Sequence, residues 1–243
     1  MISSIKKIDL SKILFIDIET VPVVSNYEEL SDIQKKYWEK KATNFKNDEE
    51  LTVAELFDKK GGIFSEYGKI ICISAGFIRK KDEEKKIRLK SFYGEDEKKL
   101  LEDFSELLKR NYNDESYYLC AHNGKEFDFP YISRRMLING IELPTILDNY
   151  GKKPWEVNFL DTMELWKFGD YKNFTSLELL AQLFGIPTPK DDIDGSQVAE
   201  IYYKYGDLPR IVKYCQKDVA TTINLFLKYR GEPIIDEKKW EIV

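Results

Sequence analysis

The sequence predicts an α/β protein built around a mixed β-sheet, on the evidence of two patterns. Runs of strand-forming residues dominate the first half of the chain, and two of these runs are separated only by the short charged turn KKDEEKK, which favours an antiparallel pair. Further along, segments with helical spacing alternate with a short apolar run that is typical of a buried strand. A strand meander followed by alternating helices and strands indicates a mixed sheet with helices packed against it.

The first predicted strand covers residues 12–20 and is apolar on both faces of its pleat, which is typical of a central strand covered on both sides. Two carboxylates, Asp17 and Glu19, interrupt this run. Because side chains two residues apart on a strand share a face, the two should lie roughly 6.6 Å apart along the strand. An ionised carboxylate buried without a partner is costly, so a compensating partner is expected for the two like charges.

The connection to the next strand is long and polar. Residues 24–60 carry scattered apolar positions such as Trp38 among many charges, and we expect one or two helices there, in an insertion of about 24–62. The next strands are predicted at residues 69–79 and 86–93, on either side of the charged turn.

The second half of the chain alternates helices with a strand. Helical spacing of leucine and phenylalanine predicts a helix within residues 95–110, and the run YYLCA predicts a buried strand at 117–121. The stretch from Thr175 to Glu178 has the form of a capping box that begins a helix. The remaining helices are predicted at residues 128–139, 195–205 and 208–230. We expect a single domain over residues 1–243.

Composition limits the class of function. Hydrophobic residues make up 42% of the 243 positions, which is enough for a substantial core, but the longest apolar run is too short to cross a bilayer. No signal peptide is expected at the N-terminus. Cys72, Cys120 and Cys215 are odd in number and lie in apolar contexts, so we expect three buried free thiols in a reducing, cytoplasmic compartment. The net charge of −5 argues against a broad nucleic-acid-coating surface, but not against a site that grips a few nucleotides.

A second polar cluster, AHNGKEFDFPYI, follows the strand predicted at 117–121. Like the carboxylates of the first strand, it lies at the carboxyl end of a strand, the edge where ligands bind in open α/β sheets. Asp128 has an alternative interpretation as the N-cap of the following helix, and Asn123 as a residue that shapes the turn. The single histidine, His122, is interpreted as a loop or strand-end residue rather than a ligand.

A third feature lies in the last predicted helix. Asp218 is placed mid-helix, where Asp is a poor helix former, and its helical neighbours include Tyr214 but no Lys or Arg. We therefore expect Asp218 and Tyr214 to share a face that is turned inward. The alternative is a boundary tyrosine beside a half-exposed aspartate.

Together the three clusters resemble the motifs of the DEDD 3'–5' exonucleases. Asp-x-Glu-Thr occupies residues 17–20, Asn-x-x-x-Phe-Asp residues 123–128 and Tyr-x-x-x-Asp residues 214–218, in the family's order and with the tyrosine of its tyrosine subclass. The sequence is most similar to stand-alone relatives of the proofreading exonuclease domain of B-family DNA polymerases. This resemblance implies a ribonuclease H-like fold with a mixed five-stranded sheet, in which an antiparallel meander is followed by parallel strands, flanked by helices.

The resemblance also implies a two-metal-ion mechanism with Mg²⁺ or Mn²⁺. Hard oxygen ligands suit these ions, and no soft ligand favouring zinc is expected at the site. Asp17 would bridge both ions, Glu19 and Asp218 would help to hold the first, and Asp128 would serve the second. Cations between the carboxylates would offset the repulsion between Asp17 and Glu19. Tyr214 would orient the attacking water, since a phenol with a pKa of about 10 is a poor base at neutral pH.

Further roles follow from the same resemblance. Thr20 would lie beside the terminal nucleotide, and Asn123 and Phe127 would line the pocket at the strand ends. Asp161 resembles an Asp-Thr pair of the superfamily and is interpreted as structural. The insertion is either a lid or a single-strand guide, with the aromatic pair at 37–38 available for base stacking, or a packing element only.

The predicted reaction is hydrolysis of phosphodiester bonds from the 3' end of single-stranded nucleic acid, DNA being favoured over RNA, with release of nucleoside 5'-monophosphates. An exoribonuclease of the same fold is one alternative, because contacts to the 2'-hydroxyl leave no readable motif. A non-catalytic nucleic-acid-binding module is the other, although such a module should lack at least one of the four acids or the tyrosine. The predicted partner is a nucleic acid 3' end, with no membrane involvement, and no polymerase domain is expected in the chain.

Overall fold

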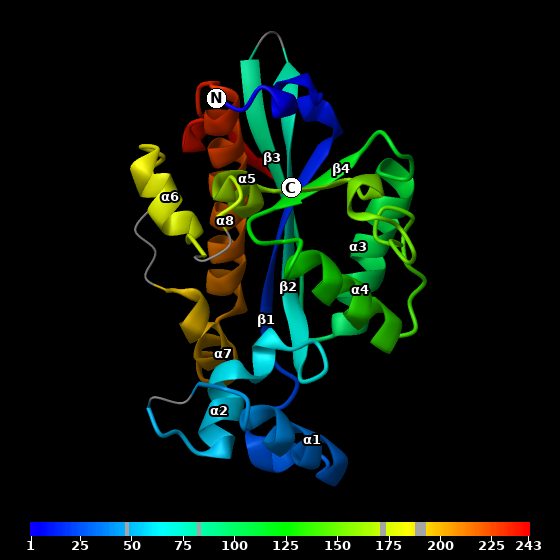
Figure 1. Cartoon of the computed structure of the whole chain (residues 1–243), viewed down its shortest axis with the longest axis vertical. Helices are drawn as coiled ribbons and strands as arrows, with labels where there is room; N and C mark the ends of the chain where they lie inside the picture. Colours follow the sequence, from blue (N-terminus) through cyan, green and yellow to red (C-terminus); the bar gives the residue numbers. More distant parts are fainter. Residues whose placement is uncertain (47–48, 82–83, 171–173, 188–192) are drawn as a thin grey trace.

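The computed structural model describes residues 1–46, 49–81, 84–170, 174–187 and 193–243, which form a mixed six-stranded sheet with helices on both faces (Figure 1). The strands are β1 (Ile13–Pro22), β2 (Gly68–Lys81), β3 (Glu84–Tyr93), β4 (Tyr118–Ala121), β5 (Phe159–Asp161) and β6 (Trp240–Ile242). Their order is β5-β4-β1-β2-β3-β6. The β1–β2 and β2–β3 pairs are antiparallel, and the remaining pairs are parallel.

The predicted mixed α/β fold is confirmed, with one strand more than expected. The four strands located from the sequence lie within a few residues of their predicted bounds. The two strands not located from the sequence are β5, which pairs with β4, and β6, where Trp240 pairs with Ile87 on the edge of β3. A three-residue strand has little periodic signal of its own, and only the free edge of β3 makes β6 a strand. Strands β2 and β3 extend further into the predicted charged turn than expected, to Lys81 and from Glu84, and residues 82–83 lie outside the described part of the chain.

The helices are α1 (Asp32–Ala42), α2 (Val53–Lys60), α3 (Glu97–Asn111), α4 (Asp128–Ile138), α5 (Thr162–Lys167), α6 (Leu177–Leu183), α7 (Val198–Glu200) and α8 (Leu208–Arg230). The helix predicted at 208–230 is confirmed residue for residue. The segment at 195–205 is instead a succession of 3-10, α and π turns. In the described part of the chain, no helix has the length and apolar character needed to span a bilayer.

The capping box predicted at Thr175 to Glu178 is wrong by one residue. Helix α6 has Ser176 as its N-cap, whose side chain accepts a hydrogen bond from the amide of Leu179. The carbonyl of Thr175 lies 2.9 Å from Nε2 of His122. A long-range contact of this kind competes with a local cap and is not visible in the sequence.

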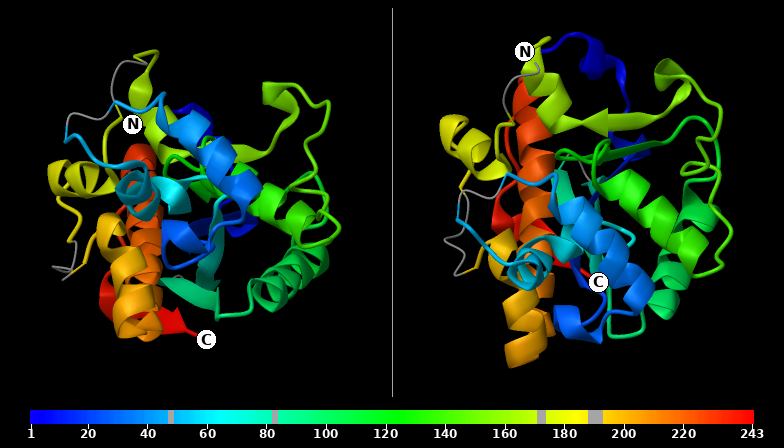
Figure 2. Two further views of the ribbon diagram at one scale, coloured as in Figure 1. Left: turned by 90° about the horizontal axis from the view of Figure 1, so that it is seen from below. Right: turned by 60° about the horizontal axis from the view of Figure 1, so that its bottom comes forward.

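The central strand β1 divides the core. Leu14 and Ile16 pack in the core beneath α3 and α4, whereas Phe15 packs in the core beneath α8. Figures 1 and 2 show these helices on opposite sides of the sheet. Because side chains alternate along a strand, Asp17 and Glu19 are directed to the same side as Phe15, toward α8.

The insertion forms helices α1 and α2, at the end of the molecule where β1 finishes (Figure 1). Both helices begin with a capping box, at Ser31 and Thr52. Trp38 is fully buried between the rings of Phe57 and Tyr67, so it cannot stack on a nucleotide base as one interpretation of the insertion required. Tyr37, by contrast, is 56% exposed.

A buried ion pair ties α3, α4 and the start of β2 together. Glu97 accepts hydrogen bonds from the amide of Ile70, from Asn139 and from the guanidinium of Arg135. Arg135 also donates to the carbonyl of Ser65, between the insertion and β2. Both charged residues are less than 10% exposed. The pair therefore fixes α4 against the sheet from within the core.

Replacing Arg135 with Met should lower the free energy of unfolding by about 3–5 kcal/mol, because it leaves the carboxylate of Glu97 buried without a cation. Urea denaturation measures this change. Arg110→Met is the matched control, since Arg110 pairs with Glu106 on the exposed surface of α3, and it should leave stability nearly unchanged. Equal stability of the two variants would contradict the role assigned to the buried pair.

Candidate active site

The site begins where β4 stops. In the described part of the chain, β4 pairs with β1 only from Ile13 to Phe15. Beyond that point this edge of β1 is not continued by β4, and the amide of Ile18 donates a hydrogen bond to Oδ1 of Asp128 at 3.2 Å. The other edge pairs with β2, with a register shift between Glu19 and Thr20. Irregularities of this kind are frequent next to active sites.

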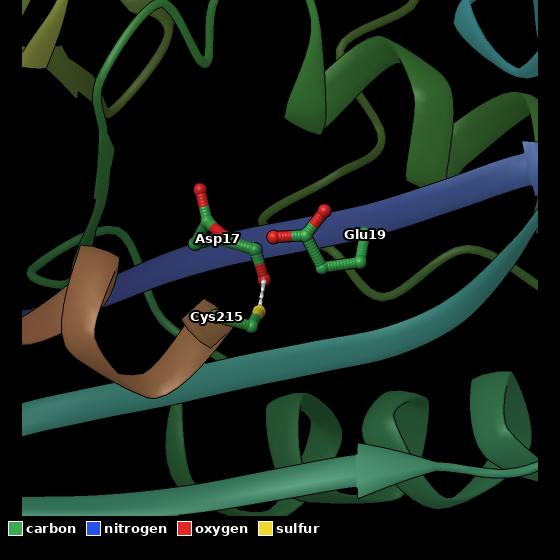
Figure 3. A group of neighbouring side chains, drawn as sticks. All are labelled: Asp17, Glu19 and Cys215. Atoms are coloured by element: carbon green, nitrogen blue, oxygen red, sulfur yellow. Dashed lines mark hydrogen bonds between the residues drawn. The ribbon is translucent and has the colours of Figure 1, made fainter. Parts of the chain in front are cut away.

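Asp17 and Glu19 form the centre of the site, as their spacing predicts. Figure 3 shows the carboxylate of Glu19 directed toward Asp17 on the strand. Glu19 is only 7% exposed. Oδ2 of Asp17 is itself buried, and no hydrogen-bond partner for it lies among the described residues. Among the residues that the structure describes, no basic side chain lowers the pKa of either carboxylate, so the two charges are not neutralised there.

Asp128 reaches the same place from α4. The helix begins at Asp128, with Phe127 as its N-cap, so Asp128 is not the cap that the alternative interpretation required. Its carboxylate, 3% exposed, is turned toward β1. Burial is the main reason that the pKa of Asp128 is raised to about 7, and the negative charges of Asp161 and Asp218 contribute.

Electrostatics link these three residues with α8. Burial and then the charges of Glu19, Asp218 and Asp128 raise the pKa of Asp17 well above its usual value. Burial and the charge of Asp218 likewise raise the pKa of Glu19. The carboxylates therefore repel one another electrostatically, and the structure brings all four acids of the sequence motifs together.

Tyr214 joins the group from α8. Its pKa is raised, first by burial and then by the charges of Asp218, Glu19 and Asp17, and a hydrogen bond to Asp218 adds to the effect. The phenol consequently stays protonated at neutral pH. Tyr214 and Asp218 share a face of α8 that is turned toward Asp17 and Glu19, and both are partly buried, so the half-exposed position of the alternative interpretation also holds.

The side chains predicted to contact substrate lie around this centre, and they differ in whether they already have partners. The hydroxyl of Thr20 donates to the carbonyl of Gly62 at 2.8 Å, and so does the hydroxyl of Tyr131. The half-buried ring of Phe127 packs against Tyr131, with 5.3 Å between ring centroids. Asn123 has a left-handed backbone with φ of 64°, and its buried Oδ1 has no partner among the described residues.

Asp161 shapes the loop that carries Asn123. Its carboxylate accepts hydrogen bonds from the amides of Asn123 and Lys125, and it also caps α5 through the amides of Met163 and Glu164. All four bonds are to backbone, which agrees with the structural role expected for Asp161. A left-handed residue in a tight loop is strained unless the surroundings hold it, and this carboxylate is what holds it.

His122 is part of the same support. Nδ1 lies 2.9 Å from the hydroxyl of Thr162, and Nε2 lies 2.9 Å from the carbonyl of Thr175. Burial lowers the pKa of His122, so the imidazole is neutral at neutral pH. With both nitrogens occupied, the strand-end interpretation of His122 agrees with its geometry.

One residue at the site was missed by sequence reasoning. Oxygen atoms of Asp17 and Glu19 and the sulfur of Cys215 all lie within 4.8 Å of one another (Figure 3). The expectation that no soft ligand is present is therefore wrong. The available signal was helical spacing, since Cys215 lies three residues before Asp218 on the same helix.

Comparison with known families gives one result. Residues 63–239 match the model of a family described as a predicted 3'-5' exonuclease related to the exonuclease domain of PolB. The matched region contains Asp128, Tyr214 and Asp218, whereas Asp17 and Glu19 precede it and join them through the fold. No curated protein sequence matches the chain.

The raised pKa of Asp128 makes stability depend on pH in metal-free protein. Below the unfolded-state pKa of about 3.9 both states are protonated, and up to a pH of about 7 the folded state binds more protons. The free energy of unfolding should therefore fall as pH rises through this window, by on the order of 1 kcal/mol per pH unit for one proton. Urea denaturation with a chelator, over a pH series, measures it.

Asp128→Asn should make that dependence less steep, because the amide still accepts from Ile18 but does not titrate, while Asp17 and Glu19 keep their raised pKa values. The control is Asp148→Asn, at an exposed loop position. An unchanged slope in Asp128→Asn would show that the pKa of Asp128 is not raised by its surroundings.

Proposed function

This chain belongs to the family of predicted 3'-5' exonucleases related to the exonuclease domain of PolB, and we propose that it is a metal-dependent enzyme that shortens single-stranded nucleic acid from the 3' end, DNA being preferred to RNA. The observation that carries the proposal is the convergence of four carboxylates, in which burial and the charges of the neighbouring acids raise the pKa values of Asp17, Glu19 and Asp128. Such a cluster is unfavourable by itself and becomes favourable when cations bind.

The residues present fit divalent cations. Carboxylate oxygens are the donors that Mg²⁺ and Mn²⁺ prefer, and the buried Oδ2 of Asp17 has no hydrogen-bond partner among the described residues. Asp17, Glu19 and Asp218 would hold one ion, and Asp128 would serve a second that shares Asp17. Bound ions would supply an activated water and neutralise charge that develops on the phosphoryl oxygens.

Tyr214 is proposed to orient the attacking water. Its raised pKa disfavours the phenolate, so proton abstraction by this residue is not part of the proposal. The hydrogen bond to Asp218 restricts the phenol, and restricting a reactant in this way lowers the entropic barrier.

The terminal nucleotide is proposed to lie at the edge of β1 that β4 leaves open. Asn123 offers a buried acceptor oxygen there, and Phe127 offers part of an aromatic face. The hydroxyl of Thr20 is engaged with Gly62, so its proposed role is to shape the pocket rather than to donate to the substrate. A local site of this kind suits an acidic protein that grips a few nucleotides.

The insertion and the cellular setting complete the proposal. We regard residues 1–243 as one exonuclease domain with the insertion at 24–62, whose end is held at the site by the bond between Thr20 and Gly62. The burial of Trp38 supports a packing role for the insertion.

All three cysteines are free and buried, as predicted, which supports a reducing, cytoplasmic compartment.

The test is a time course on 5'-labelled single-stranded oligonucleotides, in DNA and RNA, with Mg²⁺, Mn²⁺ or a chelator. We expect a metal-dependent ladder that shortens from the 3' end, faster on DNA. A faster ladder on RNA would support the exoribonuclease alternative. No ladder from folded protein would favour the non-catalytic binding module.

Single substitutions should separate the roles of the site residues. Asp17→Ala and Asp218→Ala should reduce cleavage to background while the protein stays folded. Tyr214→Phe should retain measurable cleavage, slowed by up to about 100-fold, the cost of a misplaced reactant. Rates come from the same assay, with Asp148→Ala as the control. A Tyr214→Phe protein as inactive as Asp17→Ala would contradict a purely orienting role.

Mn²⁺ should stabilise the folded protein, because an ion that binds only the folded state adds to its stability, by about 2.7 kcal/mol when free ion is about 100 times the Kd. Thermal melting with and without Mn²⁺ measures the effect. Asp17→Asn should respond much less than Asp148→Asn. No shift in the unmodified protein at saturating Mn²⁺ would argue that the carboxylates do not form an ion site.

A further inference from the structure

The thiol of Cys215 lies where a metal ligand would lie. It is completely buried on α8, one residue after Tyr214, and its sulfur is within 4.8 Å of carboxylate oxygens of Asp17 and Glu19. Its present contact is weak, a hydrogen bond donated to the main-chain carbonyl of Asp17 at 3.4 Å (Figure 3). The sulfur is therefore held beside the carboxylates and not bound strongly elsewhere.

The carboxylate of Asp17 offers a donor that nothing in the described part of the chain uses. Oδ2 of Asp17 is buried and has no hydrogen-bond partner there. Glu19, 7% exposed, is turned toward Asp17 (Figure 3) and opposes Cys72 across the β1–β2 pair. The carboxylate oxygens of Asp17 and Glu19 beside the sulfur of Cys215 form a mixed donor set rather than the all-oxygen set that the acids alone would provide.

We propose that Asp17, Glu19 and Cys215 form a three-donor site for a thiophilic divalent cation of the class of Zn²⁺ and Cd²⁺. The inference rests on the proposed function in one respect: the cation would take the place of a catalytic Mg²⁺ or Mn²⁺ and stop cleavage. One sulfur and two oxygens leave the fourth position of a tetrahedral ion to water.

Ligand softness decides which cations use the third donor. Thiolates favour Zn²⁺ and Cd²⁺, whereas Mg²⁺ and Mn²⁺ favour oxygen and gain little from sulfur. On binding, the cation–sulfur bond forms, the S–H bond breaks, and the proton passes to solvent, since a coordinated thiol is deprotonated. The weak bond to the carbonyl of Asp17 and the contact with the thiol of Cys72 are lost. The balance favours a tight complex with thiophilic cations and leaves Mg²⁺ or Mn²⁺ binding dependent on the carboxylates.

The other two cysteines provide internal comparisons. Cys72 is close enough to hydrogen-bond the thiol of Cys215 and is the rival ligand. Cys120 is equally buried but lies on β4 in the hydrophobic core beneath α8, away from the carboxylates. Cys215→Ser keeps a hydroxyl that can donate to the carbonyl of Asp17, so it removes the soft donor with little change in shape.

The test is a Cd²⁺ titration of the whole protein, followed by the ultraviolet charge-transfer band of a cadmium–thiolate bond. The unmodified protein, Cys72→Ser and Cys120→Ser should each develop the band. Cys215→Ser should lose it and bind Cd²⁺ at least roughly 100-fold more weakly by calorimetry, since even outer partners of a metal ligand contribute up to that factor. Asp17→Asn should weaken binding although all three thiols remain.

Several results would overturn the site. These are the absence of a band, a band that survives in Cys215→Ser, a band lost in Cys72→Ser, or undiminished Cd²⁺ affinity in Asp17→Asn. Should Cys215→Ser or Cys215→Ala fail to fold, competition still decides the question, because excess Mn²⁺ should weaken the apparent Cd²⁺ affinity of the unmodified protein. Independence from Mn²⁺ would show that the two cations use different places.

Cleavage with Mn²⁺ separates this inference from the proposed function. If the protein develops the Cys215-dependent band but cleaves no oligonucleotide, the thiophilic site is supported and the proposed exonuclease function is contradicted. If the protein cleaves the oligonucleotide but shows no band, only the thiophilic site is contradicted. If both hold, Cd²⁺ should inhibit Cys120→Ser at much lower concentration than Cys215→Ser.

Discussion

The burial of like charges on the central strand is the constraint on which the rest of this structure depends. Asp17 and Glu19 lie in a strand that is otherwise core, and Asp128 and Asp218 face them from two helices on opposite sides of the sheet. Their mutual repulsion and desolvation must be offset by the rest of the fold or by cations. Much of the surrounding architecture acts to hold these groups in place against that repulsion.

The support comes from neutral and paired groups next to the acids. The Glu97–Arg135 pair anchors α4, whose first residue is Asp128, and the carboxylate of Asp161 holds the preceding loop through backbone amides. Access comes from the shortness of β4, which leaves one edge of β1 to the loop and to Asp128. These contacts thus hold the carboxylates in place, next to the edge of β1 that β4 does not cover. A site for the end of a nucleic acid strand needs both features.

The insertion contributes at one well-defined point. Its aromatic cluster around Trp38 gives α1 and α2 their own small core, and Gly62 at its end accepts from Thr20 and Tyr131. A Cβ at Gly62 would lie 3.1 Å from the backbone of Val21, so the close approach suits glycine. The residue after Glu19 is therefore fixed by a segment some 40 positions away in the sequence.

What the sequence by itself determined is the local part of this arrangement. Period two places Asp17 and Glu19 on one face, and helical spacing places Tyr214 beside Asp218, because both relations depend on a single element. Tertiary structure alone decided that Asp128 turns to the amide of Ile18 instead of capping α4, that Trp38 is buried, and that Cys215 faces the carboxylates. Each of these outcomes depends on which elements meet in space, and one chain of residues carries no direct record of those long-range contacts.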